Sequence, residues 1–167
     1  MEILIVRHAV AAERDPKQWP DDRGRPLTPE GIRRFRKVAR HLGKIVPRVG
    51  GVWASPLARA WQTAEVLERE AGWPAPRELA ALEPDADPAG ALAFLAARRG
   101  ASRVALVGHE PALHELLSLL LGGSTGGVYL EMKKGGAALV RCEDGVRAGA
   151  AQLLWLLPPR VIPGVAE

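Results

Sequence analysis

The stretch "ILIVRHAVA", from Ile3 to Ala11, decides the fold and indicates where the chemistry lies. Its first four residues are aliphatic and do not alternate with polar ones. This pattern predicts a short strand, Ile3 to Val6, that is buried on both faces of a parallel sheet. The strand leads directly into Arg7 and His8, which are both side chains that bind phosphate. Because ligands of open α/β sheets bind beyond the carboxyl ends of the strands, we expect a ligand site there.

The composition is that of an ordinary globular protein, with 47% hydrophobic and 25% charged residues in a chain of 167. That length predicts a single domain over residues 1–167. No apolar stretch is long enough to cross a membrane, and the chain begins with a strand rather than a signal peptide. We therefore expect a cytoplasmic protein without a membrane partner. The one cysteine, Cys142, excludes an internal disulfide and a cysteine-based metal site.

Strand and helix patterns alternate along the first two thirds of the chain. Besides the first strand, we expect strands at residues 52–55 and from residue 103, and helices at residues 29–42, 56–72, 87–100 and 112–121. The last third instead predicts short β-strands at residues 127–132, 137–142 and 151–157, separated by turns. The sequence therefore predicts an α/β fold. We expect a three-layer α/β/α sandwich whose mostly parallel sheet gains antiparallel strands from the C-terminal third.

Polar side chains follow three of the predicted strands. Arg7 and His8 end the first strand, and Ser55 ends the second, with Arg59 one helical turn later. His109 ends the third strand, in "RVALVGHEP". The carboxyl ends of parallel strands meet at one edge of the sheet, so the two arginines and two histidines should converge. Ser55 has an alternative role as a residue at the start of a helix.

Such a cluster suits phosphoryl transfer to nitrogen. Guanidinium groups fit a tetrahedral dianion, and an imidazole that neighbouring arginines keep neutral can attack phosphorus. Water would then hydrolyse the phosphohistidine, and Ser55 is a candidate further donor to a phosphate oxygen. The arginines would repel a dication, and the chain has no zinc-binding motif, so we expect neither a metal nor another cofactor.

The formal charge of +4 raises the alternative of a nucleic-acid-binding protein. However, the densest basic run, "IRRFRKVAR" at residues 32–40, has helical spacing. It therefore indicates either a solvated helix face or a surface for an acidic or phosphorylated partner. Because RNA-recognition and zinc-finger motifs are absent from the sequence, we expect no nucleic-acid partner.

Four motifs together resemble the histidine phosphatase superfamily, which includes the phosphoglycerate mutases. They are "LIVRHA", "LTPEG", "ASPLARAWQTAE" and "LVGHEP", which occur in this order over residues 3–111. Within the superfamily, the short chain and "RPLTPEG" look most like the SixA-type phosphohistidine phosphatases. The resemblance implies a mostly parallel sheet between helices, with His8 as the phosphorylated nucleophile. It also implies that Arg7, Arg59 and His109 bind the phosphoryl group.

Two positions depart from the family pattern. The first motif usually continues with glycine, whereas this chain has Ala9, which would be strained at a positive φ. The larger members carry a catalytic acid in the region that reads "RELAALEPDADP" here, where this chain has Ala81. Glu83 is the nearest candidate acid, and a solvated or capping carboxylate is the alternative role for it.

The sequence thus predicts a metal-independent phosphatase with a covalent phosphohistidine intermediate, acting on phosphohistidine in a carrier protein. The missing acid favours a P–N bond, because an alkoxide leaving group depends more strongly on protonation. A small-molecule phosphomonoesterase or mutase is the first alternative. A phosphoprotein-binding module without turnover is the second. The sequence carries no indication of the oligomeric state.

Overall fold

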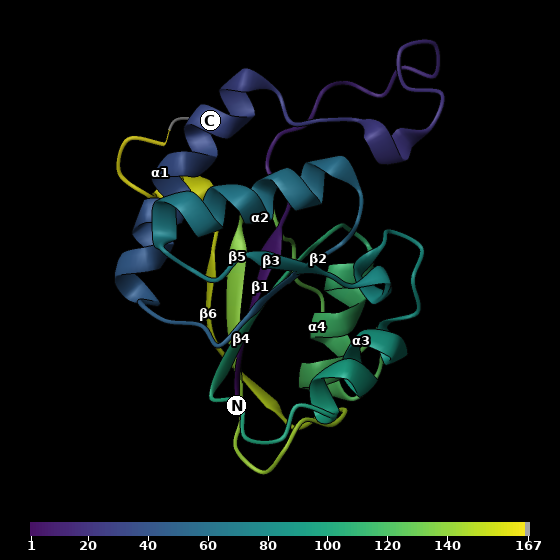
Figure 1. Ribbon diagram of the computed structural model, residues 1–167. Helices are drawn as coiled ribbons and strands as arrows, with labels where there is room; N and C mark the ends of the chain where they lie inside the picture. Colours follow the sequence, from purple (N-terminus) through teal and green to yellow (C-terminus); the bar gives the residue numbers. More distant parts are fainter. Residues whose placement is uncertain (166–167) are drawn as a thin grey trace.

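A six-stranded mixed sheet runs through the centre of the protein, whose computed structural model describes residues 1–165 (Figure 1). The strands are β1 (Glu2–Arg7), β2 (Val52–Ala54), β3 (Pro76–Glu78), β4 (Arg103–Gly108), β5 (Ala137–Cys142) and β6 (Ala151–Leu157). The α-helices of the described part are α1 (Pro29–Ile45), α2 (Ala58–Ala71), α3 (Pro88–Ala96) and α4 (Ala112–Gly122). None of these helices is long and apolar enough to cross a membrane.

The strand order is β3-β2-β4-β1-β5-β6. The first four strands in this order pair in parallel, whereas β5 pairs antiparallel with both β1 and β6. The predicted α/β class is therefore confirmed, and the antiparallel strands come from the C-terminal third as expected. Strand β3 has only three residues and pairs in parallel with β2 at the edge of the sheet.

The expected strand at residues 127–132 is wrong, because this segment is irregular. Its polar backbone groups pair with side chains of α4 instead of with a neighbouring strand. The N–H of Val128 donates to Ser118 Oγ at 2.9 Å, and the carbonyl of Leu130 lies 2.8 Å from His114 Nδ1. Hydrogen bonds to side chains of α4 thus replace the strand pairing that the β-rich composition predicts.

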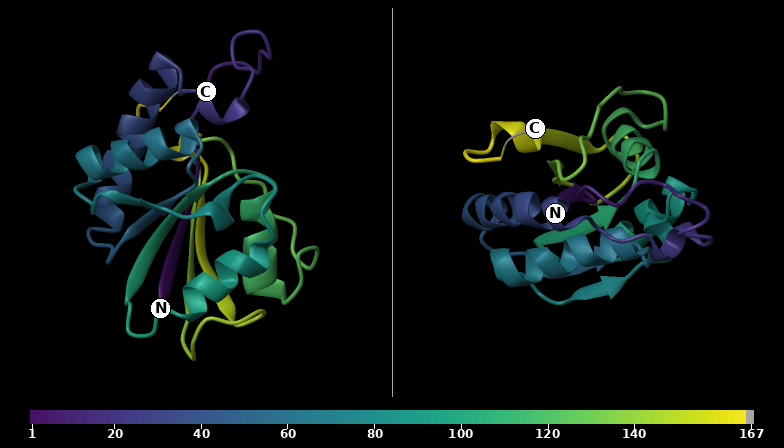
Figure 2. Two further views of the ribbon diagram at one scale, coloured as in Figure 1. Left: turned by 45° about the vertical axis from the view of Figure 1, so that its right-hand side comes forward. Right: turned by 90° about the horizontal axis from the view of Figure 1, so that it is seen from above.

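Helices cover both faces of the sheet, with α1 and α2 on one side and α3 and α4 on the other (Figures 1 and 2). Leu4 and Val6 of β1 belong to the first of these cores, and Ile3 and Ile5 belong to the second. Successive side chains of a strand point to opposite faces, so a strand covered on both sides is apolar throughout. The apolar run from Ile3 to Val6 therefore lies in a central strand that contributes side chains to both cores.

A long loop joins β1 to α1 and extends beyond the carboxyl end of the sheet (Figure 1). Its base is closed by a bridge between Ala11 and Leu27 and by the Ala12 N–H, which donates to the Pro26 carbonyl at 2.9 Å. The closed base holds the tip of the loop, which includes the short 3₁₀ turn Asp22–Gly24, over the end of the sheet.

The first turn of α1 lies directly against the residues that follow His8. Thr28 caps the helix, since its side chain accepts from the N–H of Gly31 at 2.9 Å. A Cβ at position 31 would lie 2.1 Å from the carbonyl oxygen of Val10. Only glycine permits this close approach, so it fixes how α1 packs on the chain beyond β1.

We expect Gly31→Ala to lower the free energy of unfolding by about 1–3 kcal/mol, because the added methyl group overpacks the Val10 backbone. Gly90→Ala is the matched control, since Gly90 is also the third residue of a helix that begins with proline. A Cβ there meets its nearest atom at 3.4 Å. Gly90→Ala should therefore be neutral or stabilise by about 0.4–1 kcal/mol. Denaturant unfolding of both variants checks this, and equal destabilisation would contradict it.

Candidate active site

The parallel register of β1 and β4 places two histidines side by side at the carboxyl edge of the sheet. Arg7 pairs with Gly108, so His8 and His109 are the next residues of their chains. The N–H of His8 donates to the Gly108 carbonyl at 3.0 Å. The two imidazole rings lie with their centroids 5.0 Å apart and their planes tilted by 53°. Strand pairing alone therefore assembles the centre of the site.

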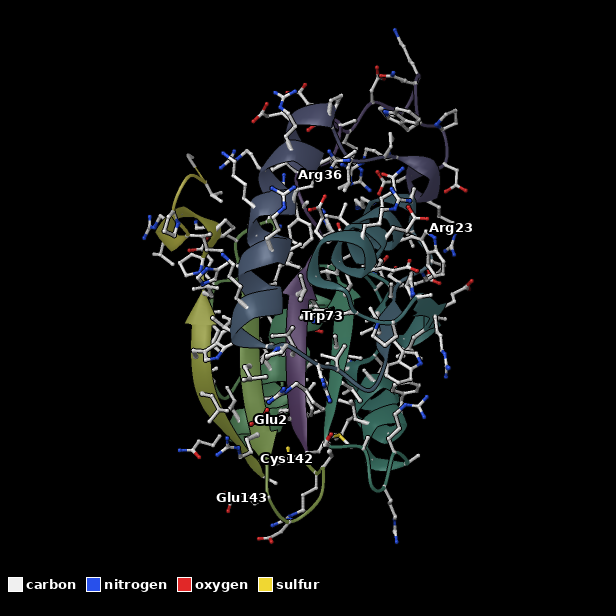
Figure 3. The ribbon with its side chains drawn as sticks, turned by 60° about the vertical axis from the view of Figure 1, so that its left-hand side comes forward. Glu2, Arg23, Arg36, Trp73, Cys142 and Glu143 are labelled. Carbon is white, nitrogen blue, oxygen red and sulfur yellow. The ribbon has the colours of Figure 1, made fainter. Side chains whose placement is uncertain are left out.

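A cavity of about 460 Å³ opens at this edge. Its lining residues are Arg7, His8, Arg14, Asp21, Asp22, Arg23, Arg25, Leu57, Arg59, Glu83, Pro84, Asp85, His109, Glu110, Pro111 and Lys134. In Figure 3, Arg23 lies at this end of the molecule, whereas Glu2 and Cys142 lie at the opposite end of the sheet. The structure thus brings together every predicted site residue except Ser55, which is fully buried behind His109.

His8 is held as a neutral imidazole with a defined tautomer. Its Nδ1 lies 2.7 Å from the carbonyl oxygen of Ala9. A carbonyl only accepts, so this contact assigns the hydrogen to Nδ1 and leaves the lone pair on Nε2. Burial, together with the charges of Arg59 and Arg7, lowers the pKa of His8 to about 3 against the opposing effect of the Ala9 carbonyl. His8 therefore carries a nucleophilic nitrogen at neutral pH.

Ala9, which replaces the expected glycine, is accommodated without backbone strain. No residue other than glycine has a positive φ among those that the structure describes. The N–H of Ala9 donates to Thr63 Oγ1 at 3.0 Å, and that hydroxyl donates to the Arg59 carbonyl at 2.6 Å. Helix α2 thereby ties the chain beyond β1 to the backbone of Arg59.

Ser55 positions His109 rather than lining the cavity. Its Oγ accepts from the Leu57 N–H at 3.3 Å and lies 2.9 Å from His109 Nε2. With the hydroxyl hydrogen directed at Nε2, the ring carries its own hydrogen on Nδ1, which is buried and has no partner. Burial, as the largest cause, and the neighbouring His8 together lower the pKa of His109 to about 3. His109 is thus arranged as a neutral donor.

Arg7 and Arg59 are anchored at one end and leave donors unused at the other. Arg59 is 4% exposed, and its Nη1 donates to the Asp22 carbonyl at 2.9 Å. Arg7 Nη1 donates to the Met132 carbonyl at 2.6 Å. Burial lowers the pKa of both groups, but a guanidinium stays charged in a protein. Two fixed positive charges therefore face the cavity.

Buried polar atoms without partners gather around this cavity. Six such side-chain atoms occur in residues 1–165, and four of them belong to residues that line the cavity. They are Nε of Arg7, Nε of Arg59, Nδ1 of His109 and Oε1 of Glu110. Buried donors are almost always paired, so three unpaired donors around one cavity indicate that an anion completes them.

The sequence analysis named neither Asp22 nor Arg25 of the long loop as a site residue. Asp22 Oδ2 lies 3.1 Å from Arg59 Nη2, and its Oδ1 accepts from Arg25 Nε at 2.7 Å. The hydrogen bond from Arg25, followed by the charge of Arg59, holds the pKa of Asp22 below its usual range. Arg25 opens "RPLTPEG", which was the available signal. Asp22 had none, because its partner Arg59 is distant in the sequence.

Glu83, the candidate acid, lies on the rim of the cavity in an ion pair with the loop. Its carboxylate accepts from Arg23 Nη1 at 2.6 Å and from Arg23 Nη2 at 3.3 Å.

Glu110 is a further cavity residue that the sequence analysis missed, although it follows His109 directly. In residues 1–165, no three His, Cys, Asp or Glu side chains are grouped so that they could hold a metal.

The arrangement suits a tetrahedral oxyanion bound next to a neutral imidazole. Two guanidinium groups and the N–H of His109 would hold the oxygens, and Nε2 of His8 would attack the central atom. The donors are in place before a ligand arrives, because strand pairing, Ser55 and Asp22 hold them.

Comparisons with known proteins agree with the predicted family and fold. Residues 3–83 match the model of the histidine phosphatase superfamily (branch 1). An uncharacterized protein of Picosynechococcus sp. is 36% identical over 155 residues, which cover 92% of this chain and 88% of that protein. The protein histidine phosphatase SixA in complex with tungstate superposes with a TM-score of 0.81 at 27% identity, covering 95% of this chain and 97% of its own. A protein of Nakamurella multipartitia assigned as phosphohistidine phosphatase SixA gives a TM-score of 0.77 at 24% identity, with 95% of each chain covered.

We expect Arg7→Ala and Arg59→Ala each to weaken the binding of inorganic phosphate about 10- to 100-fold, because each removes a charged hydrogen-bond donor. Arg33→Ala and Arg36→Ala are the controls, since both lie on α1 in surface ion pairs with Glu30 and Glu70. The shift of the unfolding temperature with phosphate concentration gives each dissociation constant. Similar losses in both pairs of variants would contradict the assignment of the site.

Proposed function

The chain belongs to the histidine phosphatase superfamily, and from this premise we propose that it removes phosphoryl groups through a covalent phosphohistidine at His8. The observation that carries the proposal is the His8 ring, which is fixed with Nε2 unprotonated among three unpaired buried donors. Membership of the superfamily implies a phosphatase or mutase. The finer proposal is a phosphohistidine phosphatase.

The proposed reaction has two displacements at phosphorus. In the first, Nε2 of His8 attacks while Arg7, Arg59 and His109 stabilise the charge on the phosphoryl oxygens. In the second, water attacks the phosphohistidine and inorganic phosphate leaves. The arginines supply the positive charge, so the proposed reaction proceeds without a metal ion.

We expect brief reaction with a phosphorylated substrate to leave phosphate on His8, labile to acid and stable to alkali. His8→Ala should remove both the label and the activity, because no other side chain of the site can accept the phosphoryl group. Ser55→Ala should keep the label, since Ser55 only positions His109. Labelling is measured in the presence of a chelator. Label on Ser55, or label that depends on added metal, would overturn the mechanism.

Two features support a phosphohistidine on a carrier protein as the substrate. The similar solved structures include the histidine phosphatase SixA, at 27% identity. The rim of the cavity includes two segments, residues 21–25 and 83–85, which are tied to each other by the ion pair of Arg23 and Glu83. A phosphohistidine that protrudes from a folded protein can approach the site across such a rim. A small phosphate ester does not need a site that is open to another protein. The basic face of α1 is a proposed guide for an acidic carrier.

We expect a higher kcat/KM for phosphohistidine, free or in a carrier domain, than for 3-phosphoglycerate or sugar phosphates at one pH and temperature. Faster turnover of a metabolite ester would favour the phosphomonoesterase or mutase alternative. Tight binding of the phosphoprotein without turnover would favour the binding module. A cytoplasmic location and the absence of nucleic-acid and membrane partners stay predictions.

A further inference from the structure

We propose that Glu110 is the proton donor to the leaving group, an inference that rests on the proposed function and assigns it the acid that the sequence did not reveal. Phosphoryl transfer from a nitrogen or an oxygen leaves a basic atom behind. Protonation of that atom by a positioned side chain contributes typically about 10²- to 10⁴-fold in rate. A site for this chemistry therefore needs a carboxyl group that faces the cavity and is not committed elsewhere.

The other carboxylates of the cavity fail this requirement. Asp22 is committed to Arg25 and Arg59, which hold it ionised. Glu83 accepts two hydrogen bonds from Arg23. Asp21 caps the 3₁₀ turn of the loop through its side chain, and Asp85 is exposed on the rim.

Glu110 differs from these carboxylates in its environment. Its Oε1 is buried and has no hydrogen-bond partner in the structure. Burial raises the pKa of Glu110, and this effect exceeds the opposing effect of Arg7. An unpaired buried carboxylate oxygen is costly, so burial favours the neutral acid, although Arg7 and the backbone of His114 favour the charged form. A neutral carboxyl group has a proton to give.

The position of Glu110 also suits the role. It follows His109 in the chain and lines the catalytic cavity together with Arg7 and His8. Arg7 and Glu110 also line a second cavity of about 370 Å³, whose remaining lining residues are Tyr129, Leu130, Glu131 and Met132. A phosphoryl group held by Arg7 thus has room on the Glu110 side, where the rest of the substrate would lie.

The proton balance closes over the two displacements. In the first, the bond from His8 Nε2 to phosphorus forms as the P–N bond of the substrate breaks. The bonding pair stays on the leaving nitrogen, which takes the proton of Glu110. In the second, water attacks phosphorus, the P–Nε2 bond breaks, and Glu110 takes one proton of the water. The products are the free imidazole, hydrogen phosphate and the enzyme in its original state.

The test uses a series of aryl phosphates, from the p-nitrophenyl ester to the unsubstituted phenyl ester. Single-turnover release of the phenol measures formation of the phosphoenzyme. A nitrophenolate departs without a proton, so Glu110→Gln should change its release little. Phenyl phosphate needs the acid, and its release should slow by about 10²- to 10⁴-fold. Glu110→Asp, which keeps the acid one methylene shorter, should fall between the wild type and Glu110→Gln.

Matched controls separate the role of Glu110 from a general loss of structure. Glu83→Gln and Glu115→Gln remove a carboxylate on the rim and one on α4, and both should keep the wild-type dependence on the leaving group. Glu110→Gln should also keep the phosphate-induced shift of the unfolding temperature, because an amide has the size of the carboxyl group and still has an oxygen that can accept from the His114 backbone. An equal loss across the ester series, no loss, or the same effect in Glu83→Gln would overturn the proposal.

The pH profile gives a second readout. The titratable and charged groups around Glu110 are Arg7 of β1, His114 and Glu115 of α4, Glu131 of the second cavity, and Lys134, which lines the catalytic cavity. An acid works only while protonated, so release of phenol should decline as the pH rises through the pKa of Glu110, above the ordinary carboxyl range. Glu110→Gln should lack this decline. Absence of phosphoenzyme in the wild type would refute the proposed function itself, whereas wild-type phosphoenzyme with an unchanged ester dependence in Glu110→Gln would refute only the role of Glu110.

Discussion

The site depends on one feature of strand pairing, the parallel register in which Arg7 of β1 lies opposite Gly108 of β4. This register brings His8 and His109 to the same height, and the hydrogen bond from the His8 N–H to the Gly108 carbonyl extends it one residue past the strands. A shift of one residue would turn the apolar residues of β1 to the opposite cores and separate the two rings. The two cores that hold the central strand therefore also hold the nucleophile against its neighbour.

Burial, more than charge repulsion, keeps the histidines neutral. For both rings burial is the largest cause of the lowered pKa, and the charge of Arg59 comes later. The sequence analysis derived the neutral nucleophile from neighbouring arginines alone, so it reached the right state through the smaller cause. The same burial acts in the opposite direction on a carboxyl group, since it favours the neutral acid at Glu110. One environment of low polarity thus favours the neutral form of both the imidazoles and the carboxyl group.

Much of the fold was predictable, because its signals are local. The apolar run of β1, the caps of α1 and α3, and the glycines that follow α2 and α4 each act within a few residues. The exception at residues 127–132 has a non-local cause. The side chains of Ser118 and His114 on α4 form hydrogen bonds with backbone groups of this segment that a strand would pair with its neighbour. The convergence of Arg7, His8, Arg59 and His109 was predictable from the rule on strand ends. The ion pair of Asp22 and Arg59 was not, because it depends on how the long loop folds back.

The location of the proposed acid has a consequence for the substrate. An acid carried by a separate lid would have to close over the phosphoryl group, which suits a small molecule that the site can enclose. Glu110 instead lies in the short turn between β4 and α4, directly after His109, and α4 begins two residues later, at Ala112. Acid, nucleophile and phosphate donors therefore hold their geometry without closure around the substrate. A site that is complete while open can act on a phosphoryl group that remains attached to another folded protein.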